Sequence, residues 1–441
     1  MQNFREKSFW LSLGEYSVSE PLRGEAKADV AIIGGGFTGL STAYFLKKYE
    51  PSLNVTLLEG EVVGFGASGR NAGFSMTLFG FTLGITALRF GRQKALEAHK
   101  YMEKAVDLLQ SLIREHNIDC DYEHNGFFRV ATSKSFEKRI KKEIELAYSL
   151  GITGIEWIDE KTLKEQVNSP IYRGAWWEPR CGLLNPVKLA RGFKKIIESM
   201  GVNIYENSPV IEIIRDNKFL LRTPLGIVQA KKIVLATNAY SLLIPQLKSK
   251  QIPVFTHIVL TEPLKEKDFK GIGWRNRQGI EDARNLVHYY RLTKDNRLLM
   301  GGRDITLTYG KNMEKDRNEK IFKKLEEDIQ KTFPALKGIK ITHQWGGPVS
   351  ATLDFAPAIG FLGDARAIYS LGCLGHGVSL THMNGWTIAE LLLEKKTERT
   401  EIFFVNRKIL PFPPEPLRFL ISKTIKGFLS LEDRRFDPIY R

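Results

Sequence analysis

Residues 29–41 read Asp29-Val-Ala-Ile-Ile-Gly-Gly-Gly-Phe-Thr-Gly-Leu-Ser41, an apolar strand followed by closely spaced glycines and the start of a helix. Gly34, Gly36 and Gly39 let the backbone turn tightly and approach a pyrophosphate, while free amides at the helix start face its negative charge. This stretch therefore predicts a cradle for a nucleotide diphosphate inside a strand–turn–helix unit.

An acidic residue stands where the next strand of this unit is expected to end. Glu59 lies twenty residues after Gly39 and closes the apolar run Val55–Leu58. Its carboxylate can accept hydrogen bonds from ribose hydroxyls. An ordinary glycine-rich turn in a βαβ unit is the alternative, but the order strand, helix, strand and acid favours dinucleotide binding.

Length and composition indicate a large globular protein. With 441 residues, 43% of them hydrophobic, the chain can bury large cores, and we expect two domains that share one cofactor cleft. Residues 1–24 lack the sustained apolar stretch of a signal peptide. The cysteines are few, widely spaced and odd in number, which argues against a disulfide framework and gives no metal-ligand spacing. We expect a cytoplasmic protein with reduced thiols and no bound metal.

The net charge of +15 does not by itself indicate nucleic-acid binding. Lysines and arginines alternate with glutamates, as in residues 136–145, a pattern typical of a solvated helix face. No zinc spacing, RNP-like strand or basic heptad region accompanies them, so we expect no nucleic-acid partner. Attraction of anionic substrates or of a membrane surface stays open. The stretch 72–88 is too short and too polar for a membrane span, and we interpret it as pocket lining.

Periodicity and turn residues predict the remaining elements. We expect helices near 92–117, up to 150, 186–200 and up to 395, and strands near 126–131, 202–205, 210–214, 219–223, 233–236, 253–261, 287–293, 297–302 and 367–372. Residues 294–296 are interpreted as a hairpin turn. The segment 251–333 is interpreted as a sheet-forming insert. No internal repeat is present in the sequence.

Taken together, these segments resemble the flavin-dependent amino-acid and amine oxidoreductases typified by D-amino-acid oxidase, glycine oxidase and sarcosine oxidase, and most closely the gamma-glutamylputrescine oxidase branch. The resemblance follows one order along nearly the whole chain. It is carried by Ser8–Trp10, the Gly34 cradle, Gly66–Gly73, Thr261–Leu264, Tyr290–Thr293, Arg297–Gly302, Gln344–Gly347, Asp354–Gly360 and Gly375–Val378.

The resemblance implies FAD as the cofactor. The residues expected to bind it are Gly34, Gly36, Phe37, Thr38, Gly39, Glu59, Ser68, Arg70, Asn71, Val210, Thr237, Gly375, His376, Gly377 and Val378. Negative charge develops near N1 and O2 of a flavin when it is reduced, and the amides of residues 375–378, at a predicted helix start, could stabilise it. A plain strand-to-helix turn is the alternative for this glycine-rich segment.

The fold class implied is mixed α/β and α+β, with a Rossmann-type FAD-binding domain and a β-sheet-based substrate domain. We expect the FAD-binding domain to be discontinuous and to comprise residues 25–90, 180–245 and 340–400. Residues 91–179 and 246–339 would form the substrate domain, and 401–441 a C-terminal tail.

Three positions depart from the family pattern. Sarcosine oxidases attach their flavin through a cysteine where this chain has Gly347, so we expect non-covalent FAD. Their oxygen-activating lysine corresponds to Leu299, so fast reaction with oxygen is not implied. The arginine that binds the substrate carboxylate in glycine-oxidase-like members is replaced by Pro348 and Val349.

The expected activity is oxidation of the C–N bond of an amine or amino acid by hydride transfer to flavin N5, followed by hydrolysis of the imine. The candidate catalytic residues are Tyr290, Arg303, His257 and Trp345. Strand alternation puts Tyr290 on the opposite face from Tyr289 and Arg291, and we favour Tyr290 as the one that faces the flavin. His257 could instead be structural, Trp345 could belong to the core, and Arg303 could pair with a surface carboxylate.

Three functions remain open from the sequence. The electron acceptor of an amine or amino-acid oxidase would be oxygen, whereas a dehydrogenase would pass electrons to a quinone. A non-catalytic FAD-binding subunit is the third possibility. In the tail, residues 414–429 carry Leu417, Leu420, Ile421, Ile425, Phe428 and Leu429 at helical spacing, which predicts an amphipathic helix. We favour packing of its apolar stripe on the body over peripheral membrane contact, and we expect the helix to end near Gly427.

Overall fold

The structure, a computed structural model, describes residues 3–437. Its helices are α1 (Phe9–Ser12), α2 (Phe37–Tyr49), α3 (Leu83–Phe90), α4 (Arg92–Glu115), α5 (Lys134–Ser149), α6 (Glu160–Gln166), α7 (Pro186–Ser199), α8 (Glu266–Ile272), α9 (Glu319–Thr332), α10 (Gly377–Leu392) and α11 (Leu417–Phe436). Short 3-10 turns occur at Phe4–Lys7, Ala67–Gly69, Asn238–Leu243 and Pro334–Leu336.

The strands form two large sheets and one small pair. They are β1 (Gly24–Ile33), β2 (Val55–Leu58), β3 (Phe74–Ser75), β4 (Phe127–Val130), β5 (Glu156–Asp159), β6 (Gly174–Glu178), β7 (Gly182–Leu183), β8 (Asn203–Tyr205), β9 (Glu212–Arg215), β10 (Phe219–Arg222), β11 (Gly226–Leu235), β12 (Ile252–Pro263), β13 (Gly279–Asp282), β14 (His288–Leu292), β15 (Arg297–Gly302), β16 (Thr306–Leu307), β17 (Ile341–Ala351), β18 (Ala358–Phe361) and β19 (Ala367–Leu371).

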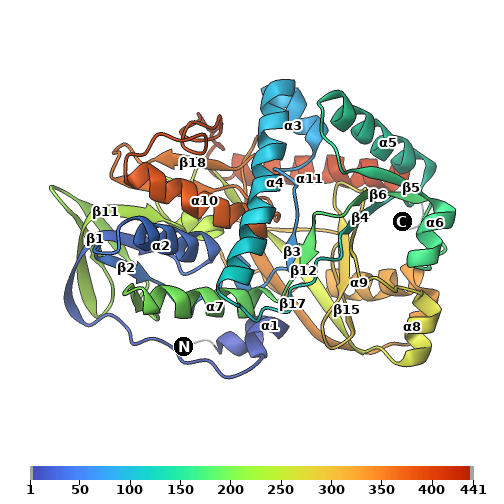
Figure 1. The fold of residues 1–441 in the computed structure, drawn as a ribbon, viewed down its shortest axis with the longest axis horizontal. Coiled ribbons are helices and arrows are strands. Elements are labelled where there is room, and N and C mark those ends of the chain that lie inside the picture. Colours follow the sequence, from blue (N-terminus) through green and yellow to red (C-terminus); the bar gives the residue numbers. More distant parts are fainter. Residues whose placement is uncertain (1–2, 438–441) are drawn as a thin grey trace.

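The first sheet has the strand order β18-β19-β11-β1-β2-β8, with β10 and β9 added beyond β11. β1 runs parallel to both β2 and β11, so their carboxyl ends, at Ile33, Leu58 and Leu235, lie at one edge. Helices α2, α7 and α10 pack together against this sheet (Figure 1). A parallel sheet covered by helices binds its ligand outside the carboxyl ends of the strands, which locates the expected dinucleotide site.

The second sheet has the order β16-β12-β15-β14-β13-β4-β6-β5, and β17 pairs with the long strand β12. Helix α9 covers one face of it, where Phe322, Leu325 and Ile329 join a buried cluster with strand residues such as Tyr290 and Met300. The opposite face is turned toward the first sheet. Figure 1 shows the two sheets on either side of the long helix α4.

The mixed fold class and most of the predicted elements are confirmed, with three corrections. Strand β17 lies in the second sheet, whereas the predicted boundary at residue 340 assigned it to the FAD-binding domain. The insert 251–333, expected to form sheet, also contains helix α9. Helix α11 continues past Gly427 to Phe436, because a glycine inside a helix costs only about 1 kcal/mol relative to alanine and does not by itself end the helix.

The orientation of α11 also differs from the favoured interpretation. Ile425 and Leu429 turn inward, but Leu417, Leu420 and Phe428 are exposed. The apolar stripe is therefore split between the body and the surface. The polar residues Ser422 and Lys426 point inward, where Lys426 pairs with Asp304 at 2.8 Å.

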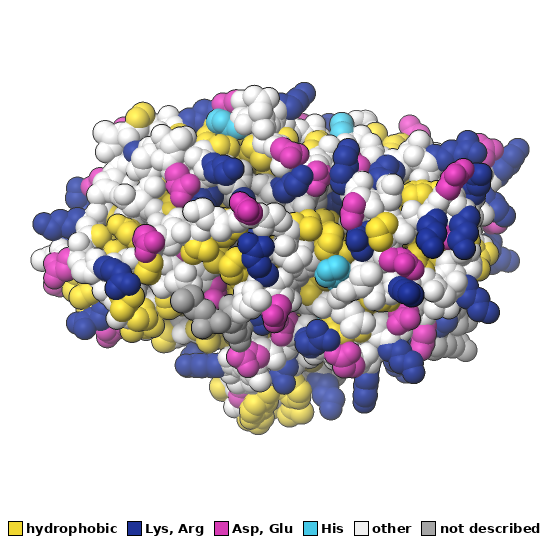
Figure 2. Space-filling view, turned by 90° about the horizontal axis from the view of Figure 1, so that it is seen from below, with side chains coloured by type: hydrophobic (Ala, Val, Ile, Leu, Met, Phe, Trp, Pro, Cys, Tyr) yellow, Lys and Arg dark blue, Asp and Glu magenta, His cyan; other side chains and the backbone are white. Residues whose placement is uncertain are grey.

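Surface charge is distributed over the face shown in Figure 2, where Lys and Arg side chains are interspersed with Asp and Glu. Within residues 3–437, no helix is both long and apolar enough to cross a membrane. All three cysteines are buried free thiols.

A cleft between the two sheets

A cavity of about 680 Å³ lies between the sheets. All the residues predicted to bind the dinucleotide line it, except Gly39. The opposite wall comes from the second sheet, and α11 contributes Ser422, Ile425, Lys426 and Leu429. Residues 72, 74, 76, 78, 81 and 82 also line it, so the interpretation of 72–88 as pocket lining is confirmed for residues 72–82, whereas residues 83–88 belong to α3 and do not line the cavity. One continuous space thus joins the glycine turn after β1 to the inner face of the second sheet.

The glycine turn is a cradle in which side chains have no room. Gly34 has φ +112°, and a Cβ added there would lie 2.7 Å from the Ala236 carbonyl oxygen. A Cβ at Gly36 would lie 2.9 Å from Ser68 Oγ, and one at Gly39 would lie 2.0 Å from the Gly34 carbonyl oxygen. Gly39 therefore serves close packing of helix on strand, while Gly34 and Gly36 shape the surface that a pyrophosphate would approach.

Helix α2 begins at this surface without a side-chain cap of its own, because its N-cap is Gly36. The Phe37 amide donates instead to Ser68 Oγ, at 3.0 Å. The remaining free amides and the positive end of the helix dipole lie where an anionic group would be stabilised. The donors present thus fit the diphosphate of FAD.

Glu59 is held at the end of β2 by backbone amides. Its carboxylate accepts hydrogen bonds from the amides of Gly35, at 2.6 Å, and Glu61, at 3.0 Å. Burial raises the pKa of Glu59 to about 7, although the hydrogen bonds from these two amides act in the opposite direction and lower it. Glu59 lines the cleft beside Gly34, where its oxygens could accept from ribose hydroxyls as predicted.

The loop that carries Ser68, Arg70 and Asn71 is held in place by a contact with strand β17. Trp345 Nε1 donates to the Arg70 carbonyl at 2.9 Å and is itself buried. Trp345 does not line the cleft, so its expected position as a pocket residue is wrong; its indole is used to hold the loop. A Cβ at Gly347 would lie 3.0 Å from the Arg70 Cβ, which leaves little room there for the cysteine that sarcosine oxidases carry.

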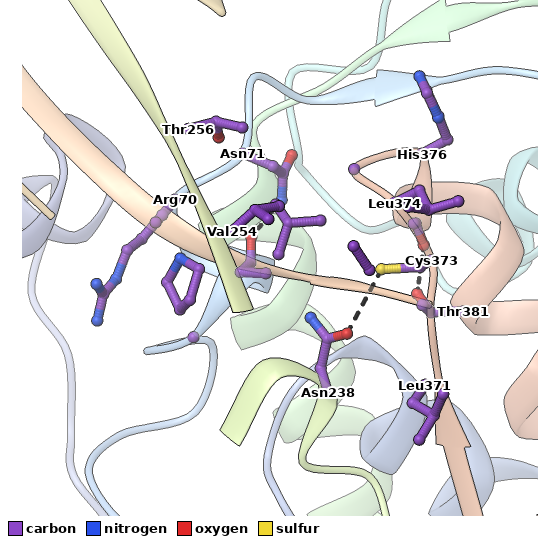
Figure 3. Close-up of a pocket in the computed structure, with 18 of the residues that line it drawn as sticks. Arg70, Asn71, Asn238, Val254, Thr256, Leu371, Cys373, Leu374, His376 and Thr381 are labelled. Carbon is purple, nitrogen blue, oxygen red and sulfur yellow. Dashed lines mark hydrogen bonds between the residues drawn. The ribbon is translucent and has the colours of Figure 1, made fainter. Parts of the chain in front are cut away.

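The turn before α10 forms the third side of the cofactor wall. Gly375 has φ +94°, and α10 begins at Gly377 with His376 as its N-cap. The Nδ1 of His376 lies 3.0 Å from the Gly80 carbonyl. Cys373 lies on the same turn with its thiol directed at Asn238, 3.6 Å away (Figure 3). Burial raises the pKa of this thiol, so it stays protonated.

The choice between Tyr289 and Tyr290 is corrected. Tyr290 is fully buried on the far side of the sheet, where its hydroxyl lies 2.7 Å from that of Tyr172 and its ring packs against Trp274 and Phe333. Tyr289 lines the cleft. The alternation was predicted correctly, but the helix that would cover one face, α9, was not predicted, so the wrong face was assigned to the flavin.

The predicted position of His257 in the cleft is wrong for the same reason. Val254 and Thr256 of β12 line the cleft (Figure 3), whereas His257 faces α9, with its ring 5.5 Å from that of Phe322. Burial lowers the pKa of His257 to about 4, so the ring is neutral near pH 7. It cannot act as a base on a molecule in the cleft from this position.

Arg303 is the one predicted catalytic candidate that the structure brings into the cleft. It adopts φ +65° after the β15 glycines and pairs with the buried carboxylate of Asp328. That carboxylate also lies 3.0 Å from His288 Nε2, and His288 Nδ1 lies 2.7 Å from Asp282. The guanidinium is thus oriented by a buried ionic network, and Asp328 is not the surface carboxylate considered as its partner.

Several cleft residues of the second sheet were not predicted, among them Glu281. Tyr289 pairs with Glu281 of β13, and both line the cleft. Among the described residues, the Glu281 carboxylate accepts no hydrogen bond, and His376 Nε2 lies 3.8 Å from it. Because β13 itself was not predicted, only its pairing with the hairpin could have identified Glu281. Other polar cleft residues absent from the prediction are Thr256, Arg129, Arg139, Arg284, Asn285, Asp304 and Lys426.

Comparison with known proteins identifies relatives along almost the entire chain. Residues 29–391 match the family DAO, described as FAD dependent oxidoreductase. Gamma-glutamylputrescine oxidoreductase of Escherichia coli (strain K12) is 34% identical over 426 residues, covering 96% of this chain and 97% of that protein. Glycine oxidase of Bacillus subtilis (strain 168) is 24% identical, covering 86% of this chain and 97% of that protein.

Solved structures agree in fold. Glycine oxidase from Geobacillus kaustophilus matches with a TM-score of 0.71 at 20% identity, covering 84% of this chain and 96% of that one. L-proline dehydrogenase from P. horikoshii matches with a TM-score of 0.70 at 22% identity, covering 87% and 96%. The resemblance inferred from the sequence motifs is confirmed, and with it FAD as the cofactor.

Proposed function

We propose, because this chain belongs to the DAO family of FAD-dependent oxidoreductases, that it oxidises the C–N bond of an amine or amino acid. Bound FAD would accept the hydride from the carbon that bears nitrogen. The nitrogen lone pair then forms the C=N bond, and water converts the resulting imine into a carbonyl compound and a free amine. The two electrons leave with oxygen, as hydrogen peroxide, or with a quinone, as a quinol.

The observation that carries this proposal is the continuity of the cleft. The glycine cradle, Glu59 and the turn at residues 375–378 would hold the cofactor, and the same space reaches Thr256, Tyr289 and Arg303 on the second sheet. The chain's own residues would bind and orient the substrate and exclude bulk water. The predicted division into a discontinuous FAD-binding domain and a substrate domain is part of this proposal, with β17 moved to the latter.

The charged residues of the second sheet suggest the kind of substrate. Arg303 could bind a carboxylate, and Glu281 could bind a non-reacting ammonium group. The Escherichia coli relative is named for gamma-glutamylputrescine, which carries a terminal amine at one end and both a carboxylate and an ammonium group at the other. We propose a substrate of this kind, with an amine to oxidise and a second charged group for recognition.

An anaerobic screen tests the proposal. The holoprotein is mixed under nitrogen with gamma-glutamylputrescine, putrescine, glycine, sarcosine and proline, and the flavin absorbance is followed. We expect bleaching by at least one of them, fastest with gamma-glutamylputrescine, which carries both a carboxylate and a non-reacting ammonium group. Stable flavin absorbance with every amine and amino acid tested would instead support a non-catalytic FAD-binding subunit.

A quinone-linked dehydrogenase is the second candidate function. The position matched to the oxygen-activating lysine is Leu299, which is fully buried in an apolar cluster with Trp345 and Ile258. No charged group stands there to favour oxygen reduction. Hydrogen peroxide formed in step with substrate under air would support the oxidase, whereas turnover that needs an added quinone would support the dehydrogenase.

We also propose that the FAD is held non-covalently. Gly347 supplies no sulfur for attachment, and it lies against Arg70. Heat or acid should release all of the flavin into the supernatant. Flavin fluorescence that migrates with the polypeptide in denaturing electrophoresis would contradict this proposal.

A further inference from the structure

Helix α11 lies beyond residue 391, where the family match ends, yet it forms part of the cleft. Its inner face presents Ser422, Ile425, Lys426 and Leu429 to the cavity. Lys426 donates to the Ile305 carbonyl at 2.7 Å and pairs with Asp304. The helix is therefore attached to the second sheet through polar contacts.

The C-terminal half of α11 is anchored in the same way. Buried Asp433 accepts hydrogen bonds from the amides of Asn285, at 2.8 Å, and Leu286, at 2.9 Å. Glu432 pairs with Arg139 of α5 at 2.7 Å. In Figure 1, α11 passes behind α4 toward α5. These contacts fix which face of the helix looks outward.

The outward face is apolar, the reverse of an ordinary surface helix. Large hydrophobic side chains follow one another at helical spacing, with exposed fractions of 54% at Leu417, 53% at Leu420, 37% at Ile421, 67% at Phe428 and 68% at Leu431. Tyr309, 57% exposed, lies against Phe419 near the beginning of the helix. Contiguous exposed apolar surface of this kind marks an interaction site.

The charges on this face have one sign. The exposed charged side chains of α11, all of whose residues the structure describes, are Lys423, Arg434 and Arg435, and none is acidic. An apolar stripe on a helix whose exposed charges are all cations is complementary to a surface that is apolar within and anionic at its boundary. A second copy of the chain would bring the same cations together and carries the same net charge of +15, so it is the poorer partner.

We propose that the outer face of α11 docks on an anionic lipid bilayer, with the helix axis parallel to the membrane plane. Phe428 and Leu431 would enter the boundary between head groups and acyl chains, and Lys423 and Arg435 would lie at the level of the lipid phosphates. The cleft would then open beside the membrane. Docking of α11 on a membrane does not depend on which amine the cleft oxidises.

Flotation of the full-length holoprotein with lipid vesicles tests the proposal. We expect binding to vesicles of phosphatidylglycerol and phosphatidylcholine, weak or no binding to phosphatidylcholine alone, and release at high salt. The double variant Phe428→Ser, Leu431→Ser should abolish binding. Lys423→Glu combined with Arg435→Glu should weaken it at least about tenfold, since each cation contributes about 1 kcal/mol near an anionic surface.

Leu88→Ser is the matched control, because Leu88 is 84% exposed on α3 but is not part of the stripe. It should bind vesicles as the unmodified protein does. The flavin spectrum should be retained in every variant, which separates loss of binding from loss of folding. Absence of flotation with anionic vesicles, or equal binding to neutral ones, would overturn the proposal. So would a dimer, detected by light scattering, that dissociates in the double variant.

Discussion

The first sheet meets the cleft with backbone, at Gly34, Gly36 and Gly375, whereas the second sheet meets it with the side chains of Thr256, Tyr289 and Arg303. On the first side, function depends on the absence of side chains and on free amides. On the second side, it depends on groups such as Arg303, held by Asp328 and His288 in a buried network.

This difference predicts different tolerance to substitution. A single side chain added to a backbone cradle blocks ligand binding, whereas exchanging one neighbouring side chain for another should have little effect. A wall of side chains can be changed one residue at a time, with effects that depend on the substrate.

Gly36→Val should abolish FAD binding, because its Cβ would lie 2.9 Å from Ser68 Oγ and its methyl groups would enter the space of the pyrophosphate. We expect purified protein without flavin absorbance and no recovery on adding FAD. Gly427→Ala is the control, since nothing lies within 4 Å of a Cβ at that position. A Gly36→Val protein that retains FAD would show that the cradle is not a backbone site.

Arg303→Ala should weaken recognition of substrates that carry a carboxylate. Loss of a charge-assisted hydrogen bond costs about 1.5–3 kcal/mol, so we expect kcat/KM for such substrates to fall about 10- to 150-fold. Substrates without a carboxylate should be affected much less. Arg297→Ala, which removes an arginine paired with Asp295 at the β14–β15 hairpin, is the control. Equal losses for both substrate classes would make Arg303 a structural residue.

Tyr289→Phe and Tyr290→Phe remove the same atom from opposite faces of β14. Tyr290→Phe leaves the buried hydroxyl of Tyr172 without its partner at 2.7 Å, and should lower the free energy of unfolding by about 1–3 kcal/mol with kcat/KM unchanged. Tyr289→Phe should change kcat/KM with little effect on stability. Denaturant titration and steady-state kinetics on both variants check this; the reverse pattern would contradict the assigned faces.

The His288 network should give stability a pH dependence. Burial lowers the pKa of His288, but Asp282 and then Asp328 outweigh it, so the pKa lies above the ordinary value of 6.5. The stabilisation by the charged ring is therefore complete below about pH 6.5 and is lost as pH rises through the higher folded-state pKa. Between pH 6 and 9, the free energy of unfolding should therefore decrease less steeply with rising pH for His288→Gln than for the unmodified protein, as measured by denaturant titration at each pH. The same pH dependence of the unfolding free energy in both proteins would show that His288 does not contribute to it.

The two walls also differed in how well they could be predicted. The cradle was predictable because glycine spacing and a terminal acid depend only on local backbone geometry, and the residues from Gly34 to Glu59 lie as expected. On the second sheet, alternation identified which side chains share a face, but the helix covering one face decides which of them is buried. The amphipathic pattern Ile321, Phe322, Leu325 and Ile329 was available to predict α9, and with it the burial of Tyr290 and His257.

The tail is a different case. Its helical spacing was visible, but its inward face is chosen by long-range partners, such as Asp304 for Lys426 and the amides of Asn285 and Leu286 for Asp433. No local rule specifies these partners. Hydrophobicity alone predicts the opposite orientation, which is why the stripe was expected to pack on the body.

The position of α11 has a consequence for synthesis on the ribosome. About 400 residues separate the glycine cradle at Gly34 from Leu429, which lines the cleft on α11. At 5–20 residues per second, this distance corresponds to about 20–80 seconds of translation. All segments that form the cofactor side of the cleft are present once α10 has emerged. Helix α11, which lines the substrate side, is synthesised later. A nascent chain that has emerged as far as residue 392 would hold every element of the flavin half beside a cleft that α11 does not yet cover. Ribosome pausing in this interval would therefore separate cofactor capture from closure of the substrate side.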